Sequence, residues 1–294
     1  MSQTQQRVFG FRTALLRAAL ALGCSVLVPS WCSAITFGQV DDFQNGTTMG
    51  WQEGMNSPNP PVNVASGGPG GTADRYLENQ SSGGFGAGGR MAMFNSSQWS
   101  GNYIAAGVNR ISVQMANLGS KELHMRIAFR SASGTLYGSS SAAILPVEPG
   151  WRSVNFDLTP EALTNMGGSD TVAQALTSVT EFRIVSAVGA PAFSGDPIAG
   201  TLGLDNMNAT TIPVPAPVIT EFGFVNDSLQ LSFVTMAGKT YRVERKDSLA
   251  DSEWVALSNA TSVSGTGNVV HVSDPQPGVR SLRQRFYRVV LLES

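Results

Sequence analysis

Apolar and polar residues alternate along much of the chain between residues 110 and 210. In "RISVQMA", "ELHMRIAFR" and "RSVNFDL" every second residue is apolar, and "EFRIV" and "GTLGLDNM" continue the pattern. A period of two puts apolar side chains on one face of a strand, which is typical of antiparallel sheets with one buried face. The predicted inward-facing residues are Ile111, Val113, Met115, Leu123, Met125, Ile127, Phe129, Val154, Phe156 and Leu158.

Two short stretches favour helix over strand. "TPEALTNMGG" offers Thr159 as a cap, Pro160 in the first turn and Gly167 as a stop, and "SDTVAQALTSV" offers Asp170 as a cap. By contrast, residues 56–89 are rich in Gly, Ser, Pro and Asn and are predicted to form a long, mostly irregular excursion. Long loops on a rigid sandwich often carry function.

The segment "TTIPVPAPVITEF" marks a domain boundary. Prolines at alternate positions (213, 215 and 217) cannot donate to a β-ladder and favour a stiff, extended linker. The segments that follow, "SLQLSFV", "KTYRVERK", "VVHVS" and "RFYRVVLL", again indicate strands. The predicted fold is all-β. A jelly-roll β-sandwich covers residues 35–210, a proline-rich linker covers 211–217, and a smaller immunoglobulin- or fibronectin-like sandwich covers 218–294.

Residues 1–34 have the features of a signal peptide. Three arginines precede an apolar run of residues 18–28, which is short for a membrane span, and "CSA" before residue 35 suits a signal peptidase. Cleavage there would remove both cysteines and shift the net charge from −2 to −5. The mature protein is predicted to be secreted or at the cell surface, not to span a membrane, and not to bind nucleic acid, because no basic stripe is present.

Several segments carry a resemblance to a known family. "VDDFQNGTTMGWQEG", "PPVNVASGGPGGTADRYLEN", "AMFNSSQWSGNYIAAGVNRISVQMANLG", "GWRSVNFDL" and "GTLGLDNM" resemble bacterial secreted jelly-roll modules, similar to carbohydrate-binding and galactose-binding-like domains. The resemblance covers nearly all of residues 37–209, shares no catalytic motif, and implies a fold and a compartment while suggesting sugar binding. "AGKTYRVERKDSLADSEW" with "RFYRV" resembles the terminal sandwich of many secreted planctomycete and verrucomicrobial proteins.

Asp41, Asp42 and Asp205 are the candidate metal ligands. The first and last strands of a jelly roll often lie side by side, which would bring Asp41 and Asp42 near the "LDN" segment that contains Asp205. Calcium prefers several carboxylate and carbonyl oxygens, and modules of the resembled class often hold a structural calcium there. The alternative is that Asp42 and Asp205 cap strand ends through backbone hydrogen bonds.

Trp99, Tyr103, Arg126 and Arg130 are the candidate ligand-binding residues. Trp99 and Tyr103 lie in the loop-like "SQWSGNY", and aromatic rings stack on the apolar faces of pyranoses. Arg126 and Arg130 share one face of their strand and could bind sugar hydroxyls or uronate carboxylates. The alternatives are that the rings plug the end of the core and that the arginines belong to a solvated outer face.

The sequence contains little that indicates catalysis. "GGFGAGG" at residues 83–89 has the glycine spacing of a dinucleotide site but lacks the strand before it and the helix after it, so its glycines are predicted to shape a tight loop. The leading hypothesis is a non-catalytic module that binds a polysaccharide or cell-surface glycan. The alternatives are a structural or adhesive surface protein and a polysaccharide-active enzyme whose two carboxylates leave no motif.

Overall fold

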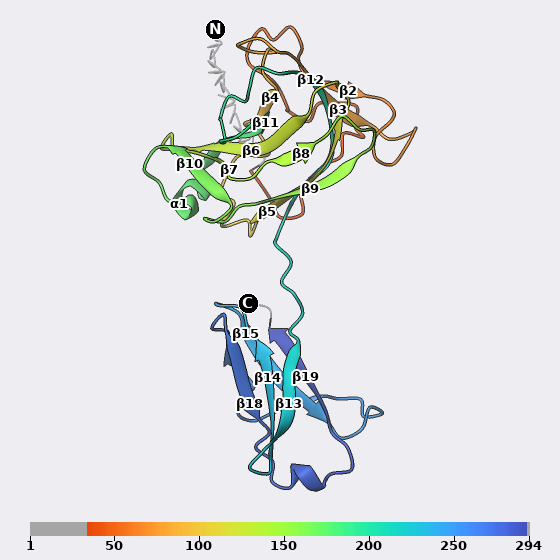
Figure 1. Ribbon diagram of the computed structural model, residues 1–294, viewed down its shortest axis with the longest axis vertical. Coiled ribbons are helices and arrows are strands. Elements are labelled where there is room, and N and C mark those ends of the chain that lie inside the picture. The colour runs from red at the N-terminus through yellow and green to blue at the C-terminus, as the bar shows by residue number, and fades with distance from the viewer. Residues whose placement is uncertain (1–33, 293–294) are drawn as a thin grey trace, which may run out of the picture. The chain divides into compact units, whose positions relative to one another are not determined.

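The computed structural model describes residues 34–292, and the chain divides into two compact units between Thr211 and Ile212. Nearly all regular structure is β, which confirms the all-β prediction (Figure 1). The predicted signal peptide, apart from its last residue Ala34, and both cysteines, Cys24 and Cys32, lie outside the described residues.

The first unit is a sandwich of two six-stranded antiparallel sheets. One sheet has the order β2-β3-β12-β5-β9, with β1 paired to β12; the other has the order β10-β7-β6-β11-β4, with β8 paired to β6. The strands of the first sheet are β1 (Val40–Asp41), β2 (Val62–Val64), β3 (Tyr76–Ser82), β5 (Arg110–Asn117), β9 (Arg152–Asp157) and β12 (Ala199–Thr210). Those of the second are β4 (Ala92–Asn95), β6 (Leu123–Ser131), β7 (Leu136–Ser139), β8 (Ala143–Leu145), β10 (Leu163–Gly167) and β11 (Val179–Ser186).

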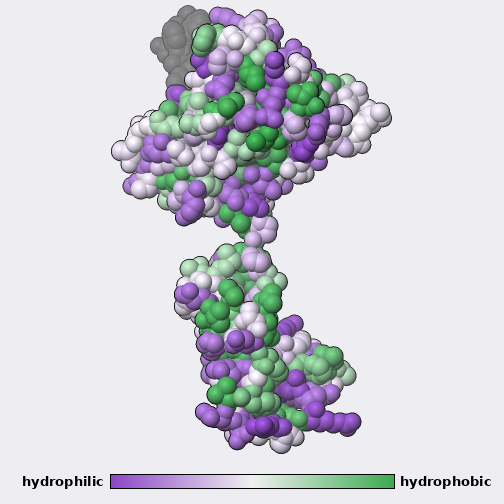
Figure 2. Space-filling view, viewed as in Figure 1, coloured by the Kyte–Doolittle hydropathy of each residue, from purple (hydrophilic) through white to green (hydrophobic). Residues whose placement is uncertain are grey.

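The core of this unit lies between the two sheets and follows the period-two pattern. Ile111 and Met115 of β5 and Ile127 and Phe129 of β6 are fully buried, whereas Val154 of β9 is half-buried at the margin of the same core. Burying a large apolar side chain contributes about 1.5–3 kcal/mol, so these inward rows are the main stabilising feature. On the outside, the visible face of the unit mixes hydrophilic and hydrophobic residues (Figure 2).

One of the two predicted helices is wrong. Residues 163–167 form the strand β10, which pairs with β7 through Leu163 opposite Ser139, because burial of Leu163 against the core outweighs a weak local preference for one helical turn. The other helix, α1 (Val172–Leu176), is present, but its cap is Thr171, which forms a capping box with Gln174.

The second unit is also a β-sandwich, with a three-stranded sheet and a four-stranded sheet. The first sheet is β13 (Ile219–Val225), β14 (Ser228–Val234) and β18 (Val269–Ser273); the second is β15 (Thr240–Lys246), β16 (Val255–Ala256), β17 (Val263–Ser264) and β19 (Phe286–Leu292), and a 3₁₀ turn covers Val279–Ser281. Its assignment as fibronectin-like stays a prediction from the sequence.

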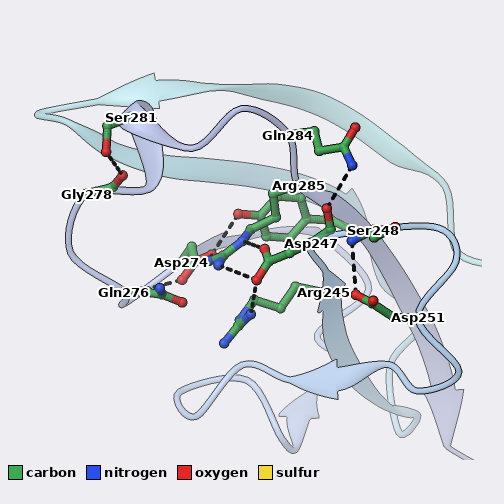
Figure 3. Close-up of polar contacts among 11 residues, drawn as sticks. Arg245, Asp247, Ser248, Asp251, Asp274, Gln276, Gly278, Ser281, Gln284 and Arg285 are labelled. Atoms are coloured by element: carbon green, nitrogen blue, oxygen red, sulfur yellow. Dashed lines mark hydrogen bonds and ion pairs between the residues drawn. The ribbon is translucent and has the colours of Figure 1, made fainter.

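A buried ion-pair network connects the loops of the second unit (Figure 3). The side chain of Arg285, 3% exposed, donates to Asp247 at 2.6 Å and to Asp274 at 2.9 Å, and the Tyr287 hydroxyl donates to the same Asp274 oxygen at 2.7 Å. Burial opposes ionisation of Asp274, but the hydrogen bonds from Tyr287, the Gln276 backbone and Arg285 together lower its pKa. Asp274 is therefore held as a buried carboxylate that depends on Arg285.

Candidate functional site

The predicted aromatic contacts, Trp99 and Tyr103, lie in the core. Both side chains are fully buried. The Trp99 indole N–H donates to Asp41 Oδ2 at 2.6 Å, and the Tyr103 hydroxyl donates to the Trp99 carbonyl at 2.8 Å while its ring stacks on Phe182. Neither ring presents a face to solvent, so neither can stack on a sugar, and the prediction of a site at these residues is wrong.

Arg126 is also a structural residue. It is 4% exposed, and its guanidinium donates to backbone carbonyls of Ala187, Ser139, Ser140 and Gly189, which fixes the segment after β11 against the end of β7. With its donors used in this way, Arg126 has no accessible edge for a ligand, contrary to the prediction. Arg130 is exposed, and its guanidinium lies over the Phe193 ring with 4.8 Å to the centroid.

Asp41 is separated from the other candidate metal ligands. It is 1% exposed, and its carboxylate accepts hydrogen bonds from the indoles of Trp51 and Trp99 and from the Gln98 amide. Burial raises the pKa of Asp41, and the three donors partly offset this increase. The Asp41 carboxylate faces the core and is occupied by these three donors, whereas Asp42, just after β1, is half-buried, so the assignment of Asp41 as a metal ligand is wrong.

The expected meeting of the first and last strands is confirmed, because β1 pairs with β12 through Asp41 opposite Met207. Asp205 is fully buried, and it lies near Asp42 and near Asp74, which the sequence did not single out. Burial, and then the charges of these two carboxylates, raise the pKa of Asp205 to about 7. The backbone N–H of Asn206 donates to Asp205 at 2.7 Å. Within residues 34–292, no group of three or more His, Cys, Asp or Glu side chains has metal-holding geometry, so calcium stays a prediction.

The accessible polar site lies elsewhere, at the β4 edge of the second sheet. A pocket of about 220 Å³, hereafter the Glu53 pocket, is lined on one side by residues before and within "GGFGAGG" and on the other by side chains of β4 and β11. Gln52 forms a β-bridge with Phe94 of β4, and Phe94 is the direct partner of Arg183 on β11. This pairing sets Glu53, Phe94 and Arg183 around one cavity.

Glu53 is the buried polar group of the pocket. It is 6% exposed; its Oε2 accepts from the Ser57 hydroxyl at 2.6 Å, while its buried Oε1 lacks a hydrogen-bond partner among the described residues. Burial raises the pKa of Glu53, and the hydrogen bond from Ser57 offsets part of this increase. A buried acceptor without a partner is uncommon, because it forfeits the hydrogen bond that water gave it.

Two guanidinium groups line the pocket, each lying over aromatic rings. The guanidinium of Arg183 lies 4.1 Å from the centroid of the Phe193 ring and 5.4 Å from that of the Phe94 ring, and it forms an ion pair with Glu181. Arg90 lies over the Phe85 ring at 5.1 Å and donates to the Gly195 carbonyl. Stacking on a ring fixes the plane of a guanidinium while leaving its edge available to a ligand.

Two exposed apolar residues, Met55 and Phe85, are sequence neighbours of residues that line the pocket. Met55 is 90% exposed and Phe85 is 82% exposed, which makes them the most exposed large hydrophobic residues in the described part of the chain. Each is next to a lining residue, since Gly54 and Gly86 both line the cavity. Exposed aromatic side chains beside convergent polar groups are typical of a binding site.

The glycines of "GGFGAGG" shape this wall, as the sequence predicted. Gly86 and Gly88 have positive φ angles. A Cβ on Gly88 would lie 2.7 Å from the Ser57 hydroxyl oxygen, and one on Gly89 would lie 2.6 Å from the Gly84 carbonyl. The loop therefore packs against the serine that holds Glu53, which ties its conformation to the site.

Comparison with known proteins gives weak similarities. No protein-family model and no curated protein sequence matches the chain. Among solved structures, an exo-β-agarase aligns with a TM-score of 0.42 and 10% identity over 61% of this chain and 26% of that one. A family 11 carbohydrate-binding module from Clostridium thermocellum, solved with a β-1,3-1,4-mixed-linked tetrasaccharide, aligns with a TM-score of 0.38 and 14% identity over 60% and 97%. This chain spans about a quarter of the length of the agarase.

Proposed function

We propose that the first unit is a non-catalytic glycan-binding module and that its ligand occupies the Glu53 pocket. The observation that carries this proposal is a cavity lined by two guanidinium groups, those of Arg90 and Arg183, each held close to an aromatic ring, with exposed Phe85 against Arg90. Sugar hydroxyls accept hydrogen bonds, so one sugar residue in the cavity can accept from the N–H donors of both guanidinium groups.

Exposed Met55 and Phe85 supply the second requirement for a sugar site. Phe85 offers an exposed ring on which the C–H face of a pyranose can stack, and Met55 offers an adaptable apolar contact. At about 220 Å³ the cavity is smaller than the roughly 300 Å³ or more of most small-molecule pockets. It suits one residue of a longer chain whose remaining sugars lie across the surface.

The compartment and the second unit belong to the same proposal. The signal-like residues 1–34 support export to the medium or the cell surface. Within residues 34–292, no helix is both long and apolar enough to cross a membrane. The second unit acts as a fibronectin-like spacer behind the proline-rich linker.

A glycan array followed by isothermal titration tests the proposal. Phe85→Ala should weaken binding of the best glycan by about 1–3 kcal/mol, the range for loss of a stacked ring. Ile144→Ala is the matched control, because it removes an exposed apolar side chain that does not line the pocket and should leave the affinity unchanged. If the array shows no glycan binding, the structural or adhesive alternative is favoured instead.

The raised pKa of Glu53 favours one second candidate function, a polysaccharide-active enzyme. A buried carboxyl with a raised pKa is what a glycosidase needs as its general acid. Reducing-sugar release from the glycan that binds best distinguishes the two functions. Release that Glu53→Gln abolishes would establish the enzyme; binding without release supports the non-catalytic module.

A further inference from the structure

Of the two arginines that line the Glu53 pocket, only one is paired with an acidic side chain. The guanidinium of Arg183 is neutralised by its ion pair with Glu181. Arg90 has no acidic partner within the described part of the chain, since its contacts are the Gly195 carbonyl and the Phe85 ring. A carbonyl and an aromatic face satisfy donors and fix orientation but leave the positive charge uncompensated, which favours an anion nearby.

The orientation of Arg90 suits an anion carried on a sugar ring. The Cζ atom of Arg90 lies 5.1 Å from the centroid of the Phe85 ring, which is 82% exposed, so a sugar that packs on Phe85 brings its substituents close to the guanidinium. A planar guanidinium binds oxyanions with two parallel hydrogen bonds, and such charge-assisted bonds are about twice as strong as neutral ones. Burial raises the pKa of Glu53, which lessens its repulsion of an incoming anion.

From this arrangement we infer that the Glu53 pocket selects a sugar residue bearing an oxyanion, a uronate carboxylate or a sulfate ester, and that Arg90 is the selecting residue. The inference rests on the proposed glycan-binding function and adds the charge of the ligand. Neutral glycans would contact the same Phe85 and the same Glu53 but would supply no negative charge to pair with the guanidinium of Arg90.

Matched ligands that differ only in charge test this inference. Polygalacturonate should bind at least about ten-fold more tightly than its fully methyl-esterified form, the ratio expected for a hydrogen-bonded charge. A sulfated galactan compared with the same galactan after desulfation separates a sulfate ester from a carboxylate as the preferred group. Binding of the preferred anion should also weaken as salt increases, because surface charge pairs are screened.

Variants assign the selectivity to one residue. Arg90→Gln should reduce the preference for the charged ligand to nearly one, and Arg90→Lys should restore part of it by keeping the charge without the planar edge. The control is Arg152→Gln, which removes an exposed arginine paired with Glu148 elsewhere in the same unit and should keep the preference. Thermal unfolding of each variant checks that it folds.

The possible outcomes distinguish a failure of the anion selectivity from a failure of the proposed glycan-binding function. If neutral glycans bind as tightly as charged ones and Phe85→Ala weakens both, the ligand charge is wrong and the glycan-binding module stands. If Arg90→Gln and Arg152→Gln lower the affinity equally, selection by Arg90 is wrong. If no glycan of either charge binds, both the inference and the proposed function are overturned.

Discussion

The carboxyl of Asp205 makes the stability of the first unit depend on pH in a direction opposite to most acidic residues. Burial and then the charges of Asp74 and Asp42 raise its pKa from 3.8 to about 7, with a hydrogen bond to Asp74 acting in the same direction. Below pH 3.8 the carboxyl is protonated in the folded and the unfolded chain, and its contribution to stability is fully present. As pH rises the unfolded chain ionises first, so the free energy of unfolding falls until pH passes about 7.

The size of this loss follows from the distance between the two pKa values. They are about three pH units apart, and each unit corresponds to about 1.4 kcal/mol, which gives about 4 kcal/mol at most. Typical domains are stable by about 5–15 kcal/mol, so the effect is large. Asp205→Asn keeps an uncharged side chain of the same shape at every pH and should remove this part of the pH dependence.

Urea unfolding followed by the fluorescence of buried Trp51 and Trp99, at pH values from 4 to 8 with a chelator present, measures the effect. The difference in unfolding free energy, wild type minus Asp205→Asn, should decrease by up to about 4 kcal/mol across this range. Glu148→Gln removes an exposed carboxylate of the same unit and should show no such trend. Parallel curves for wild type and Asp205→Asn would refute the reasoning.

Three further predictions rest on neighbouring features. Calcium should raise the melting temperature of the wild type at neutral pH, and Asp205→Ala should abolish that increase; a wild type insensitive to calcium would favour the strand-capping role. Arg285→Met should cost about 3–5 kcal/mol in urea unfolding of the second unit, because it leaves Asp274 buried and unpaired, whereas Arg280→Gln at an exposed pair should cost about 0–1 kcal/mol. Gly88→Ala should weaken glycan binding several-fold in titration, a larger loss than the fall in melting temperature measured by calorimetry would suggest. The reason is that its Cβ would displace the Ser57 hydroxyl that holds Glu53.

The sequence pattern was sufficient for the class of fold but not for every element. Period-two alternation predicts strands wherever one face is buried, and every predicted inward residue of β5 and β6 is buried, although Arg126 and Ala128 on the other face of β6 are buried as well. The segment that became β10 has only one buried apolar residue, Leu163, so its strand pairing depends on β7, which no local pattern reveals. Local propensity therefore decided the prediction there, and tertiary pairing decided the structure.

Of the candidate site, the sequence indicated the region but not the side chains. Residues 56–89 were predicted to form a long, mostly irregular excursion of the kind that often carries function, and the loop at 83–89 lines one side of the Glu53 pocket. Glu53 and Arg183 are 130 positions apart in the chain and meet only because Gln52 bridges to β4 and β4 pairs with β11. An exposed phenylalanine among glycines, Phe85, was the one local signal that could have drawn attention to this wall.

Trp99, which the sequence predicted to be an exposed contact residue, is buried, whereas Phe85 is exposed, and the burial of Trp99 has a physical cause. Asp41 follows Val40 on a strand whose inner face is the core, so its carboxylate is buried and needs donors to remain stable. The indole N–H groups of Trp51 and Trp99 are donors that bring their own apolar surface, and they satisfy Asp41 while filling the end of the sandwich. Phe85 has no such partner in the core, and it lies in the glycine-rich loop 83–89, where its ring is 82% exposed.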